Sequence, residues 1–158
     1  MKKEKLRIIR MGRGHIPVLA PIYVRAYRTR GECWTIKRAN ALLNHYLDKQ
    51  PDMAQIAEVN GVLVGAFLCL IKPWWDGAHM IETEVFVDTR CQQGGIAKVL
   101  FKALLMRSKD RYKAKTFGGM TFAKLDFPMS WYKRLGVKQA EELMFIEGNV
   151  SIMLRRLR

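Results

Sequence analysis

The chain has 158 residues, 49% of them hydrophobic, and its 28 Lys and Arg against 14 Asp and Glu give a formal net charge of +14. That length suits one domain with a sizeable core, and the hydrophobic content excludes an intrinsically disordered chain. The sequence contains no low-complexity segment, no internal repeat, no Cys and His spaced for zinc, and no apolar run long enough to cross a bilayer.

The charge is distributed unevenly along the chain. Residues 1–50 carry 12 basic and 3 acidic residues, residues 51–100 carry 3 and 6, and residues 101–158 carry 13 and 5. A basic balance indicates an anionic partner, such as a nucleotide, a nucleic acid, the ribosome or an acidic protein; a solvated basic surface is the alternative. No apolar signal core follows the first residues, so we expect a cytoplasmic protein that does not associate with membranes.

Apolar spacing predicts the elements of the first third. Residues Leu6–Arg10 have the pattern of a strand, and the spacing from His15 to Tyr27 predicts a helix that Pro21 kinks or breaks. After a loop at Arg28–Glu32, the spacing predicts a second helix from Thr35 to Leu47.

A β-hairpin follows. Two apolar runs, Met53–Val59 and Leu63–Ile71, are separated by Asn60-Gly61, which is typical of a type I′ turn. The next segment, Lys72–Ala78, contains Pro, Gly and two tryptophans and predicts a loop. Its tryptophans could line a substrate site, or they could pack on the core and hold the loop in place.

The centre of the chain passes from strand to glycine turn to helix. Over Ile81–Val87 the residues alternate, which predicts one strand face with Glu82, Glu84 and Phe86. From Ile96 the apolar residues recur at helical spacing. Glycines at such a turn allow positive φ and close approach of a ligand, and the first amides of the helix point outward, which favours phosphate binding. A tight connection without a ligand is the alternative.

The elements predicted for the last third of the chain are shorter. A basic connection at Lys109–Lys115 leads to a predicted strand, Thr121–Leu125. Asp126 and Gly136 bracket a predicted short helix, since Asp suits an N-cap and Gly the position after a helix. Residues Leu143–Glu147 and Val150–Leu154, joined by Gly148-Asn149, predict a closing hairpin.

The turn Gln92-x-x-Gly95-x-Ala97 resembles the pyrophosphate-binding motif [Gln/Arg]-x-x-Gly-x-[Gly/Ala] of the GNAT superfamily of N-acetyltransferases. Trp131-Tyr132-Lys133-Arg134-Leu135-Gly136-Val137 is similar to the late motif of that family, and Val85-Phe86-Val87 corresponds to its apolar strand end. The element order from about residue 6 to 154 matches the family as well. The resemblance implies a single domain over residues 1–158 of the α+β three-layer class, with a mixed, mostly antiparallel sheet of about six to seven strands and about four helices.

The same resemblance implies a function and a cofactor. The protein would transfer an acetyl group from acetyl-CoA to a primary amine by direct attack in a ternary complex, without a metal. The backbone of the strand end would hold the pantetheine arm, and the glycine turn would hold the pyrophosphate. The implied cofactor-binding residues are Val85, Phe86, Val87, Gln92, Gln93, Gly94, Gly95, Ile96 and Ala97. Arg90, Lys98 and Lys102 are secondary candidates for neutralising phosphates.

The reaction also needs a base and an acid. An amine of pKa about 10 is mostly protonated at neutral pH, so a carboxylate or a bound water must take its proton. Glu82 and Glu84 lie about 7 Å apart along the predicted strand at ~3.3 Å per residue, and the resemblance makes either the candidate base. Tyr132 corresponds to the tyrosine that protonates the departing thiolate in the family. The alternatives are that the glutamates form a polar face or pair with lysines, and that Tyr132 only packs.

Some positions depart from the family pattern. Gly94 stands where a basic or polar residue is common, Thr89 where proline is frequent, and Asp126 only approximates the asparagine that often precedes the tyrosine helix. A second hypothesis, based on the basic charge, is a non-catalytic GNAT-like module that binds nucleic acid or a macromolecular assembly through its basic surface. The acceptor, a small molecule or a protein, stays open, as does the oligomeric state, with a dimer among the options.

Overall fold

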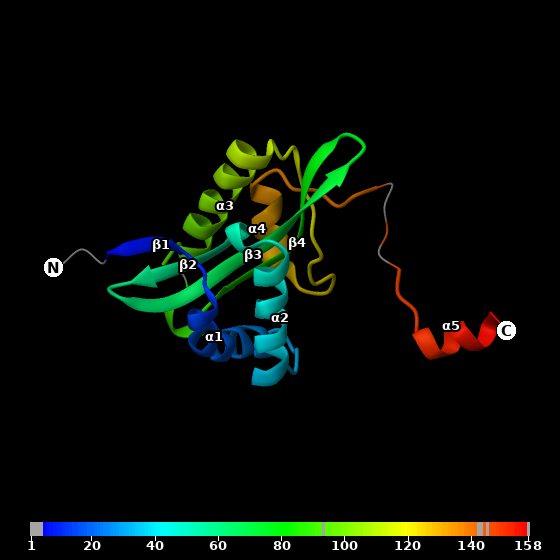
Figure 1. Ribbon diagram of the computed structural model, residues 1–158, viewed down its shortest axis with the longest axis horizontal. Coiled ribbons are helices and arrows are strands. Elements are labelled where there is room, and N and C mark those ends of the chain that lie inside the picture. The colour runs from blue at the N-terminus through cyan, green and yellow to red at the C-terminus, as the bar shows by residue number, and fades with distance from the viewer. Residues whose placement is uncertain (1–4, 93, 142–143, 145, 158) are drawn as a thin grey trace. The chain divides into compact units, whose positions relative to one another are not determined.

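The computed structural model describes residues 5–92, 94–141, 144 and 146–157 (Figure 1). The chain divides into two compact units, residues 1–120 and residues 121–158. The first unit contains every strand of the described residues, together with the glycine turn and both candidate glutamates. Each unit is described by itself below.

The first unit follows the predicted order of elements. Its strands are β1 (Leu6–Arg10), β2 (Ala54–Val59), β3 (Val62–Trp74), β4 (Gly77–Val87) and β5 (Thr116–Phe117). Its α-helices are α1 (Ile16–Arg28), α2 (Ile36–Lys49) and α3 (Ile96–Tyr112). Short 3-10 turns lie at η1 (Arg13–His15), η2 (Pro51–Met53) and η3 (Thr89–Cys91).

The strands form a single sheet in the order β1-β2-β3-β4-β5. The first four are antiparallel to their neighbours, and β5 runs parallel to β4 over only two residue pairs. The predicted mixed, mostly antiparallel architecture is confirmed, with five strands among the described residues rather than six or seven.

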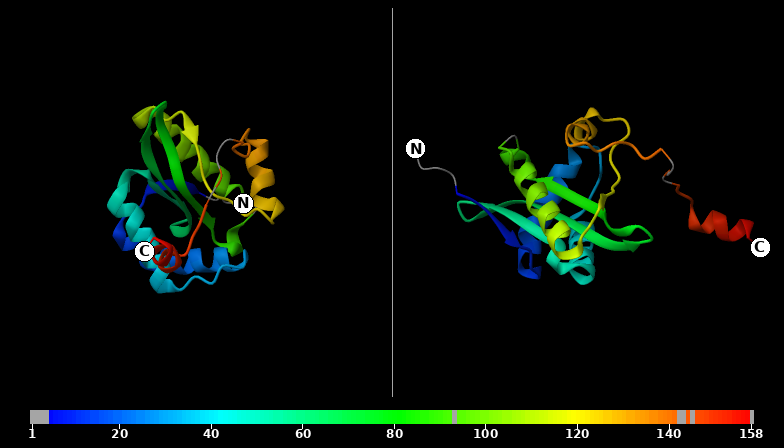
Figure 2. Two further views of the ribbon diagram at one scale, coloured as in Figure 1. Left: turned by 90° about the vertical axis from the view of Figure 1, so that its right-hand side faces the viewer. Right: turned by 90° about the horizontal axis from the view of Figure 1, so that it is seen from above.

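Helices cover both faces of the sheet (Figure 2). On one face α1 and α2 pack against alternate residues of the central strands, including Ala66, Leu68 and Phe86. On the other face Phe67 stacks on Phe101 of α3, with ring centroids 5.0 Å apart. Because successive strand residues point to opposite faces, β3 contributes to both layers. This burial on both faces explains its long apolar run.

The β2–β3 hairpin has the predicted turn. Asn60 and Gly61 have φ of 51° and 85°, the positive values that a type I′ turn requires. The N–H of Lys5 donates to Asn60 Oδ1 at 3.1 Å, and the N–H of Asn60 donates to the carbonyl of Lys5 at 3.2 Å. The turn thus also holds the start of β1.

Two predictions for the first unit are corrected. The predicted break at Pro21 does not occur: helix α1 continues through it, because the hydrogen bond lost there is to the first turn and the buried face of the helix still packs on the sheet. The segment Lys72–Ala78 is not a loop: β3 and β4 continue through it and pair as far as Trp74 and Gly77, with a two-residue turn between them.

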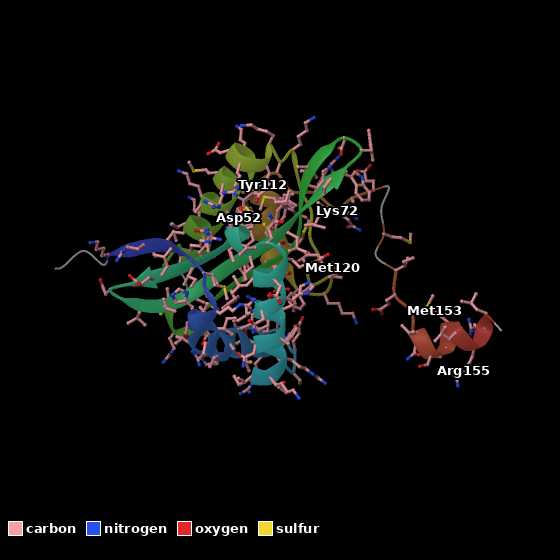
Figure 3. All side chains as sticks on the ribbon, viewed as in Figure 1. Asp52, Lys72, Tyr112, Met120, Met153 and Arg155 are labelled. Atoms are coloured by element: carbon pink, nitrogen blue, oxygen red, sulfur yellow. The ribbon has the colours of Figure 1, made fainter. Side chains whose placement is uncertain are left out.

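A polar cluster attaches α3 to the start of β2. Asp52 is buried, and its carboxylate accepts the Tyr112 hydroxyl at 2.5 Å, Arg111 Nε at 3.1 Å and Gln50 Nε2 at 3.2 Å; Asp52 and Tyr112 are marked in Figure 3. These contacts hold the C-terminal end of α3 in place. Because α3 is a rigid helix, fixing its C-terminal end also fixes its N-terminal end, which lies beside the glycine turn.

The second unit contains α4 (Asp126–Arg134) and α5 (Val150–Arg156). The predicted short helix is confirmed, and Gly136 after it has φ of 85°. The predicted strand Thr121–Leu125 is absent, since these residues form no ladder. The closing hairpin is also wrong for residues 150–154, which are helical because Asn149 caps them by accepting the N–H of Ile152 at 3.1 Å; Leu143 lies outside the described residues. None of the described helices has the length and apolar character to cross a bilayer.

Candidate functional site

A β-bulge interrupts the central strand between the two candidate glutamates. Leu68 pairs with Glu84 and Leu70 with Ile81, so β4 has one residue more than β3 between these pairs. Such a bulge reverses which residues point to which edge of a strand. The expectation that Glu82 and Glu84 share one regular strand face is therefore wrong.

The bulge determines which backbone groups of β4 face away from β3. Before it, the carbonyls of Ala78 and Met80 face β5 and accept the N–H groups of Lys115 (3.0 Å) and Gly118 (2.8 Å). After it, the N–H of Asp88 donates to Val64 of β3 at 2.7 Å. Since alternate residues of a strand point to opposite edges, Val85 and Val87 direct their N–H and C=O groups away from β3.

The β4–β5 ladder ends before this outward edge. β5 pairs only with His79 and Met80, and within the described part of residues 1–120 no strand other than β3 pairs with Val85 or Val87. The side-chain amide of Gln92 donates to the carbonyl of Val87 at 3.2 Å. The outward main-chain groups of Val85 therefore have no strand partner among the described residues of this unit, and an extended ligand could pair with them as an added strand would.

Glu84 lies against helix α1 and is the better enclosed of the two glutamates. Its Oε2 accepts the hydroxyl of Tyr23 at 3.1 Å and the hydroxyl of Tyr27. The two tyrosines are four residues apart on one helix face, and their rings stack with centroids 4.3 Å apart. Both bonds reach the same oxygen, so neither tyrosine occupies Oε1.

Burial raises the pKa of Glu84, and the hydrogen bonds from Tyr27 and Tyr23 lower it part of the way back. The nearby Glu32 raises it further. Burial also raises the pKa of both tyrosines, so they stay protonated and act as donors. A carboxyl with a raised pKa is closer in proton affinity to an amine than an ordinary surface glutamate is.

Glu82 has a different environment. Its side chain is exposed, and its backbone has φ of 48°, which is uncommon for a residue with a side chain. The hydroxyl of Tyr46 donates to its carbonyl at 2.5 Å and holds this conformation. Glu82 therefore shapes the bulge through its backbone, while its carboxylate remains in solvent.

Aromatic side chains around Glu84 were not predicted as site residues. Tyr23 also contacts Trp34 edge to face at 5.1 Å, and Trp34 Nε1 donates to Glu32 at 2.5 Å. The sequence placed Tyr23 and Tyr27 only on the inner face of a helix. A signal was present, however, because two tyrosines at positions i and i+4 on a buried face each need a hydrogen-bond acceptor.

Of the two glycines in the turn, only Gly95 has the positive φ that the sequence predicts. Gly95 has φ of 72° at the N-cap of α3, and among the described residues no side-chain cap bonds the first amides of that helix. A Cβ added at Gly95 would meet open space, so backbone conformation and not crowding selects glycine there. Gly94 is exposed and has no such restriction. Gln93 lies outside the described residues.

Asp88 connects the strand end, the turn and helix α1. It is only 2% exposed, and its carboxylate binds Arg25 and Arg90, each at 2.7 Å. Hydrogen bonds from Arg90, with those from Arg25, hold the pKa of Asp88 well below its usual range. Arg90, a secondary candidate for binding phosphate, is thus already paired with a carboxylate.

The remaining predicted residues lie on α3 and α4. Ile96 and Ala97 form the first turn of α3, with Ile96 buried, and Lys98 and Lys102 are exposed on that helix. Tyr132 belongs to α4 of the second unit, where its ring packs on Trp131 at 5.2 Å, so its pairing with a glutamate stays a prediction. The described residues contain no cluster of three or more His, Cys, Asp or Glu suited to a metal.

Comparisons with known proteins identify the family of this chain. The family model described as the acetyltransferase (GNAT) family matches residues 17–136. A structure described as a possible acetyltransferase from Clostridium difficile 630 superposes with a TM-score of 0.78 at 13% identity, covering 92% of this chain and 98% of that one. A search of curated proteins found no match.

Two further similar structures hold a ligand. Aminoglycoside N-acetyltransferase AAC(6')-Iy in complex with CoA has a TM-score of 0.70 at 17% identity, covering 93% of this chain and 97% of that one. A predicted acetyltransferase with acetyl-CoA from Clostridium acetobutylicum has a TM-score of 0.69 at 17% identity, covering 90% and 96%. At these identities the likeness concerns the fold. The family model covers most of the chain, and the protein therefore belongs to the acetyltransferase (GNAT) family and is an acyltransferase.

Proposed function

We propose that the protein is an acetyl-CoA-dependent N-acetyltransferase that acts on a primary amine by direct attack in a ternary complex. One observation carries the proposal furthest: an outward strand edge at Val85 and Val87 lies one 3-10 turn before a helix N-terminus that begins at a left-handed glycine. This order suits a ligand with an extended amide-bearing arm and a diphosphate.

The described residues fit acetyl-CoA at both ends of that path. The outward groups of Val85 suit the amides of the pantetheine arm, and the uncapped amides around Ile96 and Ala97 suit the diphosphate. Phe86 supports this arrangement from the other face by packing on Tyr23 at 5.0 Å. Acetyl-CoA supplies the acetyl group as an activated thioester. Similar structures that contain CoA or acetyl-CoA support this assignment.

Glu84 is the better candidate for the base. It takes up a proton from the ammonium form of the acceptor, directly or through one water, on the oxygen that the tyrosines leave open. Glu82 is the second candidate, and its exposed carboxylate suits attraction of a cationic acceptor more than proton transfer. Tyr132 is proposed as the donor that protonates the departing thiolate, on the strength of its position in the late motif.

The direct test measures release of free thiol from acetyl-CoA in the presence of a panel of amines, including aminoglycosides, polyamines and peptides. We expect turnover with at least one cationic amine. Failure of acetyl-CoA to bind in calorimetry, with no turnover for any amine, would instead favour a non-catalytic GNAT-like module.

Three variants assign the roles. We expect Glu84→Gln to lower kcat/KM by about 10²- to 10⁴-fold, the range of general acid–base catalysis, and Glu82→Gln to change it by less than about tenfold. The opposite order would assign the base to Glu82. If Tyr132→Phe leaves turnover unchanged, the proton-donor assignment fails while the reaction itself stands.

A further inference from the structure

Two tryptophans stand exposed at the tip of the β3–β4 hairpin, far from the candidate site. Trp75 is 89% exposed and Trp74 is 47% exposed. Figures 1 and 2 show this tip, in green, extending beyond helices α1, α2 and α3. Along β4 the tip is seven residues from Glu84, or about 20 Å at ~3.3 Å per residue, which is too far for one small acceptor to reach both.

Neither of the ordinary roles of tryptophan applies to Trp75. Packing on the core, one of the roles considered from the sequence, would have buried the ring, and it is almost fully in solvent. The turn does not require an indole either, since Gly77, with φ of 134°, provides the unusual conformation beside it. With the half-exposed Trp74 beside it, Trp75 forms an exposed aromatic patch, the kind of surface that marks interaction sites.

The tip is held rigidly. The side chain of His79 is 2.6 Å from the carboxylate of Asp76, and Lys115 Nζ donates to the carbonyl of Asp76 at 3.1 Å. The N–H of Lys115 also donates to Ala78 at 3.0 Å. These bonds fix the hairpin to the segment that follows α3, so Trp75 projects from a preorganised turn.

One lysine lies over the Trp74 ring, and further lysines lie on the neighbouring connection. Lys72, marked in Figure 3, places its Nζ 4.2 Å from the ring centroid of Trp74. Lys113 and Lys115 are exposed on the adjoining connection, where Lys115 touches the hairpin. The chain as a whole carries a net charge of +14. Planar rings beside ammonium groups match a ligand that has flat aromatic faces and regularly spaced negative charges.

We propose that this surface, formed by Lys72, Trp74, Trp75, Lys113 and Lys115, binds single-stranded nucleic acid. Unpaired bases stack on the indoles, and the lysines contact the phosphates. Other occupants fit less well. An anionic bilayer would require apolar neighbours to follow the rings into hydrocarbon, whereas here they are Lys72, Pro73 and Asp76. A protein interface would deplete charge at its centre.

The test uses the full chain and a fluorescein-labelled single-stranded RNA of about 12 nucleotides, measured by anisotropy. Trp75→Ala should weaken binding about 5- to 100-fold, the range for one stacked base, and Trp75→Phe should restore most of it. Lys72→Ala with Lys113→Ala should reduce the slope of log affinity against log salt by about 1.4, since each phosphate contact on a single strand contributes ~0.7.

Matched controls locate the effect. Val62→Ala, on the exposed β2–β3 hairpin, and Lys37→Ala, exposed on α2, should leave RNA affinity unchanged. Trp75→Ala should also leave acetylation of a small amine unchanged, so the outcome is independent of the proposed function. The proposal is overturned if Trp75→Ala binds RNA like the parent protein. It is equally overturned if phosphatidylserine vesicles or polyglutamate bind this surface more tightly than the RNA does.

Discussion

At the scale of single residues, the two phenols of Tyr23 and Tyr27 and the carboxylate of Glu84 form one hydrogen-bonded group. Tyr23 is fully buried, and the hydroxyls of Tyr23 and Tyr27 both donate hydrogen bonds to one oxygen of Glu84. Burial raises the pKa of the Glu84 carboxyl, and the hydrogen bonds from Tyr27 and Tyr23 oppose that rise.

Removing one donor should therefore move the pH profile. Tyr27→Phe removes a hydrogen bond that lowers the pKa of Glu84, so the pKa rises and the acid limb of kcat/KM moves to higher pH. Tyr23, Tyr46 and Glu32 also face this carboxyl and are kept unchanged. Tyr112→Phe, the same change at the distant Asp52 cluster, should leave the limb in place. An unchanged profile in Tyr27→Phe would exclude Glu84 as the titrating base.

At the scale of the element, the backbone conformation of Gly95 determines the shape of the glycine turn. Gly95→Ala places a Cβ in the left-handed region, which costs about 1–2 kcal/mol, and the turn is expected to relax away from its ligand-binding shape. Chemical denaturation should show this loss, and calorimetry a weaker affinity for acetyl-CoA. Gly94→Ala is the matched control, because its Cβ would have only ordinary contacts, the nearest at 3.8 Å. Equal effects of the two changes would contradict this account.

Asp88 joins three elements, and its loss should appear as a pH-dependent stability change. Asp88→Asn removes charged hydrogen bonds to Arg90 and Arg25, at a cost of about 2 kcal/mol in the free energy of unfolding. The folded pKa is depressed, so the stabilisation is present above the unfolded pKa of about 3.9 and is lost as pH falls through lower values. The difference between the proteins should shrink below pH ~4 in denaturation curves. A constant difference would contradict the ion-pair explanation.

For the whole molecule, ligand binding should be visible as stabilisation. Acetyl-CoA at about 100 times its Kd should raise the free energy of unfolding by about 2.7 kcal/mol. For a chain of this size that corresponds to a rise in Tm of roughly 5–10 °C in a thermal scan. Adenosine alone, which lacks both the diphosphate and the pantetheine arm, serves as the control and should produce little shift. No shift with acetyl-CoA would contradict the assignment of the outward edge and the glycine turn.

Local signals in the sequence predicted much of the first unit correctly. Asn60-Gly61 specifies its turn through φ, Thr35 caps α2 by accepting the N–H of Arg38, and the helical stripe from Ile96 predicts α3. Each of these depends on neighbours within a few residues, so no tertiary information is needed. The same holds for the glycine turn, because a left-handed N-cap selects glycine locally.

The wrong secondary-structure predictions fall where contacts between residues distant in the sequence determine the structure. The strand Thr121–Leu125 and the closing hairpin had suitable composition but no strand partner among the described residues, and a strand is stable only when it is paired. Pro21 and the hairpin tip show the reverse case, in which packing and pairing extend an element through residues that usually end it.

The sequence by itself determined the family, the order of elements in the first unit and the glycine turn, because these follow from periodicity and from residues with restricted backbone conformations. Only the tertiary structure shows how the environments of the two glutamates differ. A bulge of one residue in β4 reverses the strand edges, and helix α1 brings two phenols to Glu84 from about sixty residues away. No periodic pattern encodes a contact over that separation, since it exists only once α1 has packed on the sheet.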